Sequence, residues 1–337
     1  MFFKNQCIGK YQILDTIGTG GFGSVYLARD VLIDKKVAVK VPHKQGEKVE
    51  KLLREPRLLA ALNHPNIVSV ITAEKINDVF YIVMEYVEGE SLEQYLRREG
   101  PPEISLALDW FIKIAGALVY AHDKNVLHRD IRPANILLSN DGHIKVADLG
   151  TSRYLMEEDR FASTRIGSPP YMAPEHFQGK ATLQSDIYSF GILIYECLTG
   201  KLPFYDKNPK VLAQMARGGQ VRPAFELNPD INPDLNRLIS RAMHPKLGTR
   251  YPTVVEVLSE LKRIQLSSRI ESSQELAHLV GPDRNESRVT SNRSDSRHIQ
   301  LPRNLPTREI SSLFCWNCSK PVQKRTRNCP HCGVSLD

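Results

Sequence analysis

A glycine-rich run near the start of the chain, Gly-Thr-Gly-Gly-Phe-Gly at residues 18–23, is the first pattern that could carry chemistry. Glycines let backbone N–H groups approach phosphate oxygens because no Cβ intervenes. In a dinucleotide-binding turn, a helix would follow and an acidic residue would come about 20 residues later. Here a strand-like segment follows at residues 25–29, and Lys40 stands at that distance. The pattern favours a hairpin that covers phosphates, with a lysine on the next strand, over a plain hairpin with a surface lysine.

Three short polar motifs follow the glycine-rich run. They are His-Arg-Asp at residues 128–130 with Asn135 close behind, Asp-Leu-Gly at 148–150, and Ala-Pro-Glu at 173–175. With the glycines and Lys40 upstream, their order and spacing match the protein kinase signature set. From about residue 11 to residue 264, the chain therefore resembles a protein Ser/Thr kinase of the eukaryotic-like (Hanks) type.

This resemblance implies a reaction and a role for each motif residue. Transfer of a phosphoryl group needs positioning and charge neutralisation more than covalent help from the protein. Asp130 is expected to orient the substrate hydroxyl and to accept its proton. Asn135 and Asp148 are expected to hold the Mg²⁺ (or Mn²⁺) ions that accompany ATP. Lys40, itself held by Glu55, is expected to fix the α- and β-phosphates.

The resemblance also outlines a pocket for ATP. Met84 takes the gatekeeper position, and the backbone of Glu85 and Val87 is expected to hydrogen-bond with the adenine. The glycine-rich loop is expected to cover the phosphates. The full set expected to contact ATP comprises Ile17, Gly18, Thr19, Gly20, Gly21, Phe22, Gly23, Ser24, Val25, Ala38, Lys40, Met84, Glu85, Val87 and Leu137.

Arg132 and Pro56 are two of the positions that depart from the usual pattern of the family. Arg132 stands where Ser/Thr kinases carry lysine, as in some tyrosine kinases, but residues 167–175 are typical of the Ser/Thr type. A guanidinium can still meet the γ-phosphate in fork geometry, so Arg132 is counted among the catalytic residues. Pro56 directly follows Glu55 inside an expected helix. Because an interior proline costs about 3 kcal/mol, we expect a kinked or mobile helix and a looser Lys40–Glu55 pair.

The segment from residue 148 to residue 175 resembles an activation segment. Arg129, beside Asp130, is expected to pair with a phosphate on this segment, which would order it through charge-assisted hydrogen bonds. Thr164 is the first candidate for that phosphosite and Ser163 the second. The alternative is a segment that is ordered without phosphorylation.

Three further expectations follow from the resemblance. Residues 167–171 are expected to receive the substrate residue. Glu175 is expected to pair with Arg250, and Asp186 to support the catalytic loop from below. The last two roles are structural rather than catalytic.

These motifs lie on elements of two kinds. Short β-branched runs bounded by turn residues predict strands in the first 95 residues or so, and helical periodicity dominates after residue 91. The fold class expected is α+β: a bilobal kinase-like domain over residues 1–265, with a β-rich N-lobe (about 1–87) and a helical C-lobe (about 88–265), plus a small zinc ribbon. The expected strands are 9–17, 24–29, 36–41, 67–76 and 79–85, and the expected helices are 47–62, 105–124, 185–199, 208–217 and 234–242.

The C-terminal part of the chain has a different composition. Residues 266–312 are rich in Ser and Arg and predict a flexible linker, with a possible short helix near 272–280, because they bury too little apolar surface. Residues 313–337 then carry two C-x2-C pairs, which resemble a structural zinc ribbon. Disulfides or free thiols are the alternative for these cysteines. The expected Zn²⁺ ligands are Cys315, Cys318, Cys329 and Cys332.

Composition limits the remaining possibilities. The chain has 337 residues, 41% of them hydrophobic, and a net charge of +7, which permits a phosphate-bearing ligand without demanding nucleic acid. We find no signal peptide or apolar run of membrane-spanning length, so we expect a cytoplasmic enzyme without a membrane partner. Its expected partners are protein substrates and a second copy for autophosphorylation. Two alternatives stay open: a pseudokinase scaffold that acts through the ribbon, and a tail that senses nucleic acid or redox state and controls the kinase.

Overall fold

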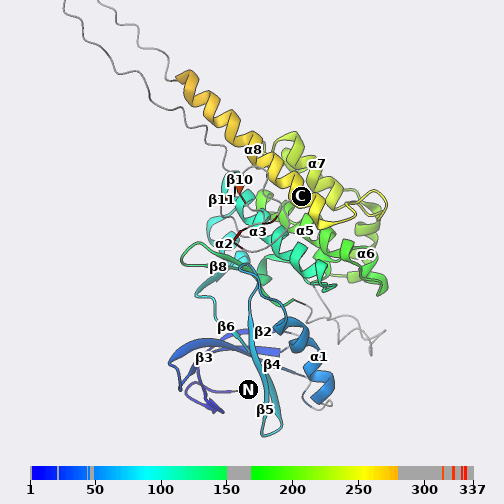
Figure 1. The fold of residues 1–337 in the computed structure, drawn as a ribbon. Coiled ribbons are helices and arrows are strands. Elements are labelled where there is room, and N and C mark those ends of the chain that lie inside the picture. The colour runs from blue at the N-terminus through cyan, green and yellow to red at the C-terminus, as the bar shows by residue number, and fades with distance from the viewer. Residues whose placement is uncertain are drawn as a thin grey trace, which may run out of the picture. The chain divides into compact units, whose positions relative to one another are not determined.

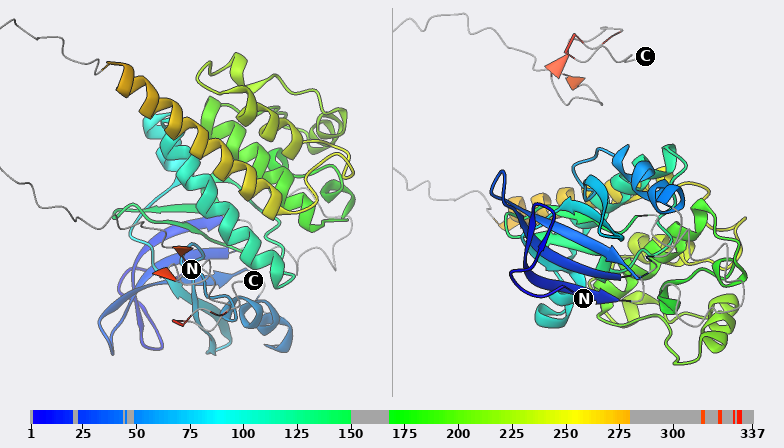
Figure 2. Two further views of the ribbon diagram at one scale, coloured as in Figure 1. Left: turned by 45° about the horizontal axis from the view of Figure 1, so that its top comes forward. Right: turned by 90° about the horizontal axis from the view of Figure 1, so that it is seen from below.

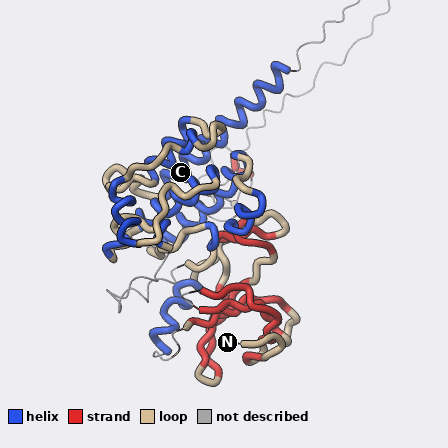
Figure 3. The backbone as a smooth tube through the Cα atoms, turned by 180° about the vertical axis from the view of Figure 1, so that it is seen from behind, coloured by secondary structure: helices blue, strands red, loops and turns tan. Residues whose placement is uncertain are grey.

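A computed structural model describes residues 2–20, 23–43, 45, 49–149 and 168–279, together with 313–314, 321–322, 328 and 330–331. The chain divides into two compact units, Met1–Gly281 and Pro282–Asp337. The first unit has two lobes, with strands gathered at one end and helices at the other (Figures 1 and 3). This is the division that the periodicity of the sequence predicted.

The N-lobe is built on a six-stranded antiparallel sheet with the order β1-β2-β3-β4-β6-β5. Helix α1 (Val49–Ala60) contacts strand β5 of this sheet. Each expected strand is present, with its bounds shifted by three residues or fewer. The strands are β1 (Cys7–Ile8), β2 (Tyr11–Gly20), β3 (Gly23–Asp30), β4 (Lys35–Pro42), β5 (Val70–Ile76) and β6 (Val79–Glu85).

Alternation along these strands separates a face packed in the N-lobe core from the opposite face, because successive side chains point to opposite faces of a sheet. Tyr26 pairs with Val39, and both lie in the buried core of the N-lobe. The alternate positions, Val25 opposite Lys40 and Ala38 opposite Met84, therefore share the other face. The sheet thus places four residues expected to contact ATP on one surface.

A small three-stranded sheet follows the N-lobe. It has the order β7-β8-β9, with β7 (Gly89–Ser91), β8 (Ile136–Ser139) and β9 (Ile144–Val146). The 3-10 turn η1 (Pro133–Asn135) leads directly into β8. Because β8 pairs with β9, the sheet holds Asn135, just before β8, close to Asp148, just after β9.

The C-lobe is helical. Its helices are α2 (Leu92–Glu99), α3 (Ile104–Asp123), α5 (Leu183–Thr199), α6 (Pro209–Gly218), α7 (Pro233–Ala242) and α8 (Val254–Leu279), joined in part by the 3-10 turns η2 (Pro169–Tyr171), η3 (His176–Gln178) and η4 (Ala224–Glu226). Helices α3 and α8 run side by side, as Figure 2 shows. In the described part of the chain, α3 alone has the length and apolar composition to cross a membrane. It is instead a core helix, since Phe111, Ile114 and Leu118 are fully buried in the C-lobe.

Helix α8 differs from the sequence expectation. It runs from Val254 to Leu279, although no helix was expected over residues 254–265 and a flexible linker, with a possible short helix near 272–280, was expected from residue 266. Its first half packs through buried Leu261 and Ile264. Beyond them, Gln265 donates a hydrogen bond to Asp109 of α3, and Arg269 lies 3.7 Å from the same carboxylate. These polar contacts join the part of α8 after Ile264, which has few apolar residues, to α3.

Helix α1 contains Pro56, and the sequence predicted a kinked or mobile helix there. The structure has one helix from Val49 to Ala60, in which Pro56 is buried. Leu59 and Leu62, just beyond the proline, pack against the C-lobe core. The kink at Pro56 stays a prediction.

The second unit is described only in short pieces. Strand β10 (Leu313–Phe314) pairs antiparallel with β11 (Pro321–Val322), with Leu313 opposite Val322. The four expected zinc ligands, Cys315, Cys318, Cys329 and Cys332, lie outside the described residues.

Candidate active site

Lys40 and Asp148 meet where the two lobes face each other. The Nζ atom of Lys40 lies 2.6 Å from Oδ1 of Asp148, and Lys40 is only 5% exposed. Burial alone would raise the pKa of Asp148, but the charge and the hydrogen bond of Lys40 outweigh it and lower the pKa. Asp148 also has a left-handed backbone, with φ of 57°. The pair therefore presents an ionised carboxylate and an ammonium at one point.

Asp130 and Asn135 form the second polar pair of the site. The Asn135 side-chain amide donates from Nδ2 to the Asp130 backbone oxygen at 2.7 Å and to its Oδ2 at 2.9 Å. Because Nδ2 is used in this way, Oδ1 of Asn135 is the atom left to bind a cation. The backbone of Asn135 also accepts a hydrogen bond from Ala147, the residue before Asp148, at 2.8 Å. Oxygen atoms of Asn135 and Asp148 fit Mg²⁺, which prefers hard oxygen ligands.

Asp186, at the start of α5, holds the loop that carries Asp130. Its two carboxylate oxygens accept hydrogen bonds from the backbone of His128 at 2.9 Å and of Arg129 at 2.8 Å. His122 on α3 donates a third from Nε2 at 2.8 Å. Burial acts to raise the pKa of Asp186, but the His122 hydrogen bond and neighbouring charges lower it overall. The expected support of the catalytic loop from below is present.

Arg132 is held by two neighbours on different elements. It donates hydrogen bonds to the hydroxyl of Ser168 and, at 3.2 Å, to Glu93 on α2. Its side chain is 29% exposed. The guanidinium therefore lies beside the segment at residues 168–171 that was expected to receive the substrate residue.

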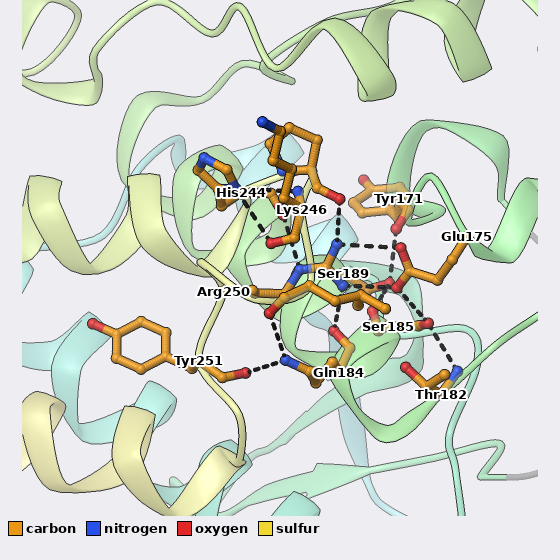
Figure 4. A network of polar contacts seen from close by, with 12 residues as sticks. Tyr171, Glu175, Thr182, Gln184, Ser185, Ser189, His244, Lys246, Arg250 and Tyr251 are labelled. Atoms are coloured by element: carbon orange, nitrogen blue, oxygen red, sulfur yellow. Dashed lines mark hydrogen bonds and ion pairs between the residues drawn. The ribbon is translucent and has the colours of Figure 1, made fainter.

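Glu175 and Arg250 form a buried ion pair, as expected. Arg250 donates from Nη1 to Oε1 at 2.7 Å and from Nη2 to Oε2 at 3.2 Å, and its side chain is fully buried. Figure 4 shows that the pair lies within a wider network, in which Ser185 donates to Glu175 and Arg250 donates to the backbone of Gln184. Burial acts to raise the pKa of Glu175, but Arg250 and Ser185 lower it overall. The network fixes the end of the activation segment against α5.

This arrangement can be compared with known proteins. The family model described as the protein kinase domain matches residues 11–261. The chain belongs to the protein kinase family. Its C-lobe and N-lobe are those of the protein kinase fold.

Sequence relatives and a solved structure agree with this assignment. The chain is 35% identical over 268 residues to the serine/threonine-protein kinase PrkC of Bacillus subtilis, covering 78% of this chain and 41% of that protein. It is 31% identical over 287 residues to the probable serine/threonine-protein kinase PknB of Lactococcus lactis, covering 83% of this chain and 45% of that protein. It thus spans less than half the length of either relative.

The crystal structure of Rad53 1-466 in complex with AMP-PNP is similar in fold, with a TM-score of 0.65 and 27% sequence identity. The similarity covers 74% of this chain and 64% of that one.

The residues expected to enclose the adenine come from both sheets of this kinase domain and from the segment after β6. Ala38 is buried opposite Met84, while Val25, Val87 and Leu137 are half-buried. Glu85 uses its side chain to pair with Lys145 on β9 at 2.8 Å, and its N–H donates to Ser69. In the part of the chain that the structure describes, nothing accepts a hydrogen bond from the N–H of Val87. This N–H remains available for an adenine.

A cavity of about 20 Å³ lies behind Lys40 and Met84, lined also by Asp148 and by residues of α1 and β5. It is large enough for about one water molecule. This cavity is too small to hold a further chemical group of a ligand bound in the ATP pocket.

Several predicted site residues are only partly described. The ends of the glycine-rich loop belong to β2 and β3, but Gly21 and Phe22 lie outside the described residues. Glu55 lies within α1, but its side chain is not described, so Asp148 is the partner that the structure assigns to Lys40. The candidate phosphosites Thr164 and Ser163 also lie outside the described residues.

Sequence reasoning missed Glu93 and Lys145 as neighbours of the site, whereas Ser168 belongs to the segment that it expected to receive the substrate residue. Glu93 lies in the first turn of α2, a helix that the sequence analysis did not predict. A local signal for α2 exists, because Ser91 and Gln94 form a capping box at its start. No local signal connects Glu93 to Arg132, which lies 39 positions away along the chain.

Proposed function

We propose that the chain is an ATP-dependent protein Ser/Thr kinase that transfers the γ-phosphate of ATP to protein hydroxyl groups. The observation that carries the proposal is that Lys40 pairs with Asp148 while Asn135, bonded to Asp130, accepts a hydrogen bond from the residue before Asp148, all within a match to the protein kinase domain. The names of PrkC and PknB as serine/threonine-protein kinases support the choice of substrate class. Intact motifs favour an active enzyme over a pseudokinase scaffold.

The chain's own residues divide the work of the reaction. Lys40 binds the phosphates of ATP once the nucleotide inserts beside its pair with Asp148. The Asp130 carboxylate, oriented by Asn135, accepts the proton of the substrate hydroxyl at Oδ1 or Oδ2. Bound Mg²⁺ supplies neutralisation of phosphate charge, and Asn135 and Asp148 are the residues that hold it. Arg132 donates to the transferred phosphoryl group from a position that Glu93 maintains.

The direct test is a phosphotransfer assay with the full chain. The purified protein is incubated with labelled ATP and Mg²⁺, with and without a generic protein substrate, and phosphosites are identified by mass spectrometry. We expect label on serine and threonine residues, including residues of the chain itself. Two outcomes would refute the proposal. One is label on tyrosine alone, and the other is a wild-type protein that incorporates no more label than the Asp130→Asn variant.

We propose further that phosphorylation of the activation segment raises activity, with Thr164 as the first site and Ser163 as the second. Arg129, next to Asp130, is the residue that would receive the phosphate. Phosphatase treatment is expected to lower the rate, and Thr164→Ala to reproduce that loss, with Ser163→Ala as the comparison. A Thr164→Ala enzyme as fast as the phosphorylated parent would exclude Thr164 as the switch.

We also propose that residues 313–337 bind one structural Zn²⁺ through Cys315, Cys318, Cys329 and Cys332, and serve interaction or regulation. Strands β10 and β11 flank the first cysteine pair in sequence, which supports a hairpin there. A two-stranded hairpin is marginal alone, so metal binding must stabilise it. Elemental analysis under reducing conditions is expected to find one zinc per chain, lost in Cys315→Ser. Absence of zinc from the wild type would refute this module.

A nucleic-acid-binding tail is the alternative, and salt-dependent binding of nucleic acid would favour it.

A further inference from the structure

A second, larger cavity lies in the C-lobe, away from the residues assigned to phosphotransfer. Its volume is about 450 Å³, within the range of small-molecule sites. It is formed where the ends of α6 and α7 approach two loops, residues 219–223 and 243–249. It is far larger than the cavity behind Lys40, so its occupant can be a whole small molecule or one modified side chain.

Fixed contacts build the walls of this cavity. Gly219, with φ of +63°, ends α6 against Pro245, and a Cβ at this glycine would lie 2.8 Å from the proline ring. Tyr195 on α5 donates from its hydroxyl to the backbone of Arg222 at 2.9 Å. On the opposite side, buried Arg250 donates to the backbone of His244 at 2.9 Å. The cavity therefore belongs to the packed structure of the C-lobe.

The lining of the cavity is basic. Arg217, Arg222, His244 and Lys246 line it, and no acidic residue does. Arg222 is partly neutralised by Glu226, 3.0 Å away. Among the residues that the structure describes, none forms an ion pair with Arg217 or Lys246. Two cations without an acidic partner around one cavity match a ligand with two negative charges.

Uncharged donors complete the lining. Nδ1 of His244 contacts the backbone of Lys246, 3.1 Å from its nitrogen and 3.3 Å from its oxygen (Figure 4), and the imidazole supplies a ring N–H. Thr249 adds a hydroxyl group, whereas the hydroxyl of Ser240 donates to the backbone oxygen of Asn236 at 2.9 Å. A hydroxyl, an imidazole N–H, an ammonium and a guanidinium are together the donor types that bind phosphate oxygens.

We propose that this cavity binds a phosphate monoester, through Arg217 and Lys246 as the principal cations. The size of the cavity favours one compact ligand over an acidic peptide or a nucleic acid strand. The same chemistry has two sources: a phosphorylated threonine or serine side chain, and a small soluble phosphate ester. The proposal goes beyond phosphotransfer and does not depend on it.

The test measures binding to the full chain by isothermal titration calorimetry, with ADP and Mg²⁺ saturating the nucleotide site. The probes are phosphothreonine blocked at both ends, ribose 5-phosphate and inorganic phosphate. We expect one site per chain for at least one ester, and at least about tenfold weaker binding in the double variant Arg217→Gln/Lys246→Gln. The ester that binds more tightly identifies the source.

Two further variants keep the test decisive. Lys35→Gln/Lys262→Gln removes the same charge from exposed lysines outside the cavity and is expected to bind like the wild type. Arg217→Lys/Lys246→Arg keeps both charges and is expected to retain binding, which guards against a misfolded neutral variant. The proposal is overturned by equal binding in the wild type and the neutral double variant, by an equal loss in the lysine control, or by no binding of any probe at about 10 mM.

Discussion

At the scale of single residues, the catalytic assignment depends on Asp130, whose carboxylate the Asn135 amide orients at 2.9 Å. Asp130→Asn keeps the size of the side chain but removes the proton acceptor. We expect kcat for phosphotransfer to fall roughly 10²–10⁴-fold, the usual contribution of a positioned base. Affinity for ADP and Mg²⁺ is expected to stay near the wild-type value, and calorimetry checks it.

The control for this change is Asp141→Asn. Asp141 lies in the turn between β8 and β9 with 69% of its side chain exposed, and a hydrogen bond from Ser139 lowers its pKa. Its variant is expected to keep the full rate. If Asp130→Asn is as fast as Asp141→Asn, Asp130 is not the base.

Lys40 supports a different part of the reaction, because its ammonium contacts Asp148 at 2.6 Å and faces the expected phosphates. Lys40→Ala removes a positioned positive charge from a nearly buried site. We expect kcat to fall roughly 10²–10³-fold, the cost of removing one preorganised donor. Lys35→Ala, an exposed lysine on the same strand, serves as the control. Equal rates for the two variants would contradict a role for Lys40 in positioning phosphates.

At the scale of elements, the glycine-rich hairpin depends on close packing between β3 and β4. A Cβ at Gly23, where φ is +152°, would lie 2.3 Å from the backbone oxygen of Val41. Gly23→Ala is therefore expected to destabilise the domain by about 1–3 kcal/mol in chemical denaturation. Gly20→Ala is the matched comparison, since a Cβ there meets no atom of the described residues within 4 Å. We expect its free energy of unfolding to change by about 0.5 kcal/mol or less.

Elements also explain where sequence periodicity succeeded. The strands of the N-lobe and four C-lobe helices (α3, α5, α6 and α7) were predicted because each carries its own pattern of buried positions. Helix α8 was missed, apart from a possible short helix near residues 272–280, although Leu261 and Ile264 in its first half are buried. Beyond them, Gln265 and Arg269 contact α3. Such contacts depend on a partner element and leave no local pattern.

At the scale of the whole molecule, the buried Glu175–Arg250 pair links the end of the activation segment to the loop before α8. The folded-state pKa of Glu175 is lowered from its ordinary value of 4.5, so its contribution to stability is complete above that value. It is lost as the pH falls through the lower folded-state pKa. Below pH 4.5 we therefore expect the free energy of unfolding of the wild type to decrease.

Arg250→Met isolates this contribution. The variant leaves Glu175 buried without its cation, and we expect its free energy of unfolding to be about 3–5 kcal/mol lower than that of the wild type at pH 7. This difference in free energy of unfolding should narrow as the pH approaches 4, because the unpaired carboxyl can then be neutral. Arg237→Met breaks an exposed pair with Asp234 and should cost no more than about 1 kcal/mol. A pH-independent gap for Arg250→Met would contradict the assigned ion pair.

The sequence by itself determined the family, the two-lobed division and most members of the candidate site. The glycine run, Lys40, the 128–130 motif and Asp148 are recognised by type and spacing, since each motif is continuous in the chain. The same holds for the cysteine pairs, whose zinc binding stays a prediction.

Tertiary structure alone decided how these pieces meet. Lys40 contacts Asp148, which lies 108 positions further along the chain. Asp186 accepts hydrogen bonds from the backbone of two residues that lie 58 and 57 positions before it, His128 and Arg129. Glu93 beside Arg132 and the basic cavity around Arg217 and Lys246 arise in the same way, from elements brought together by packing. Spacing along the chain reports only neighbours within a few residues. Contacts between distant elements depend on how their apolar faces pack, and no local pattern records that.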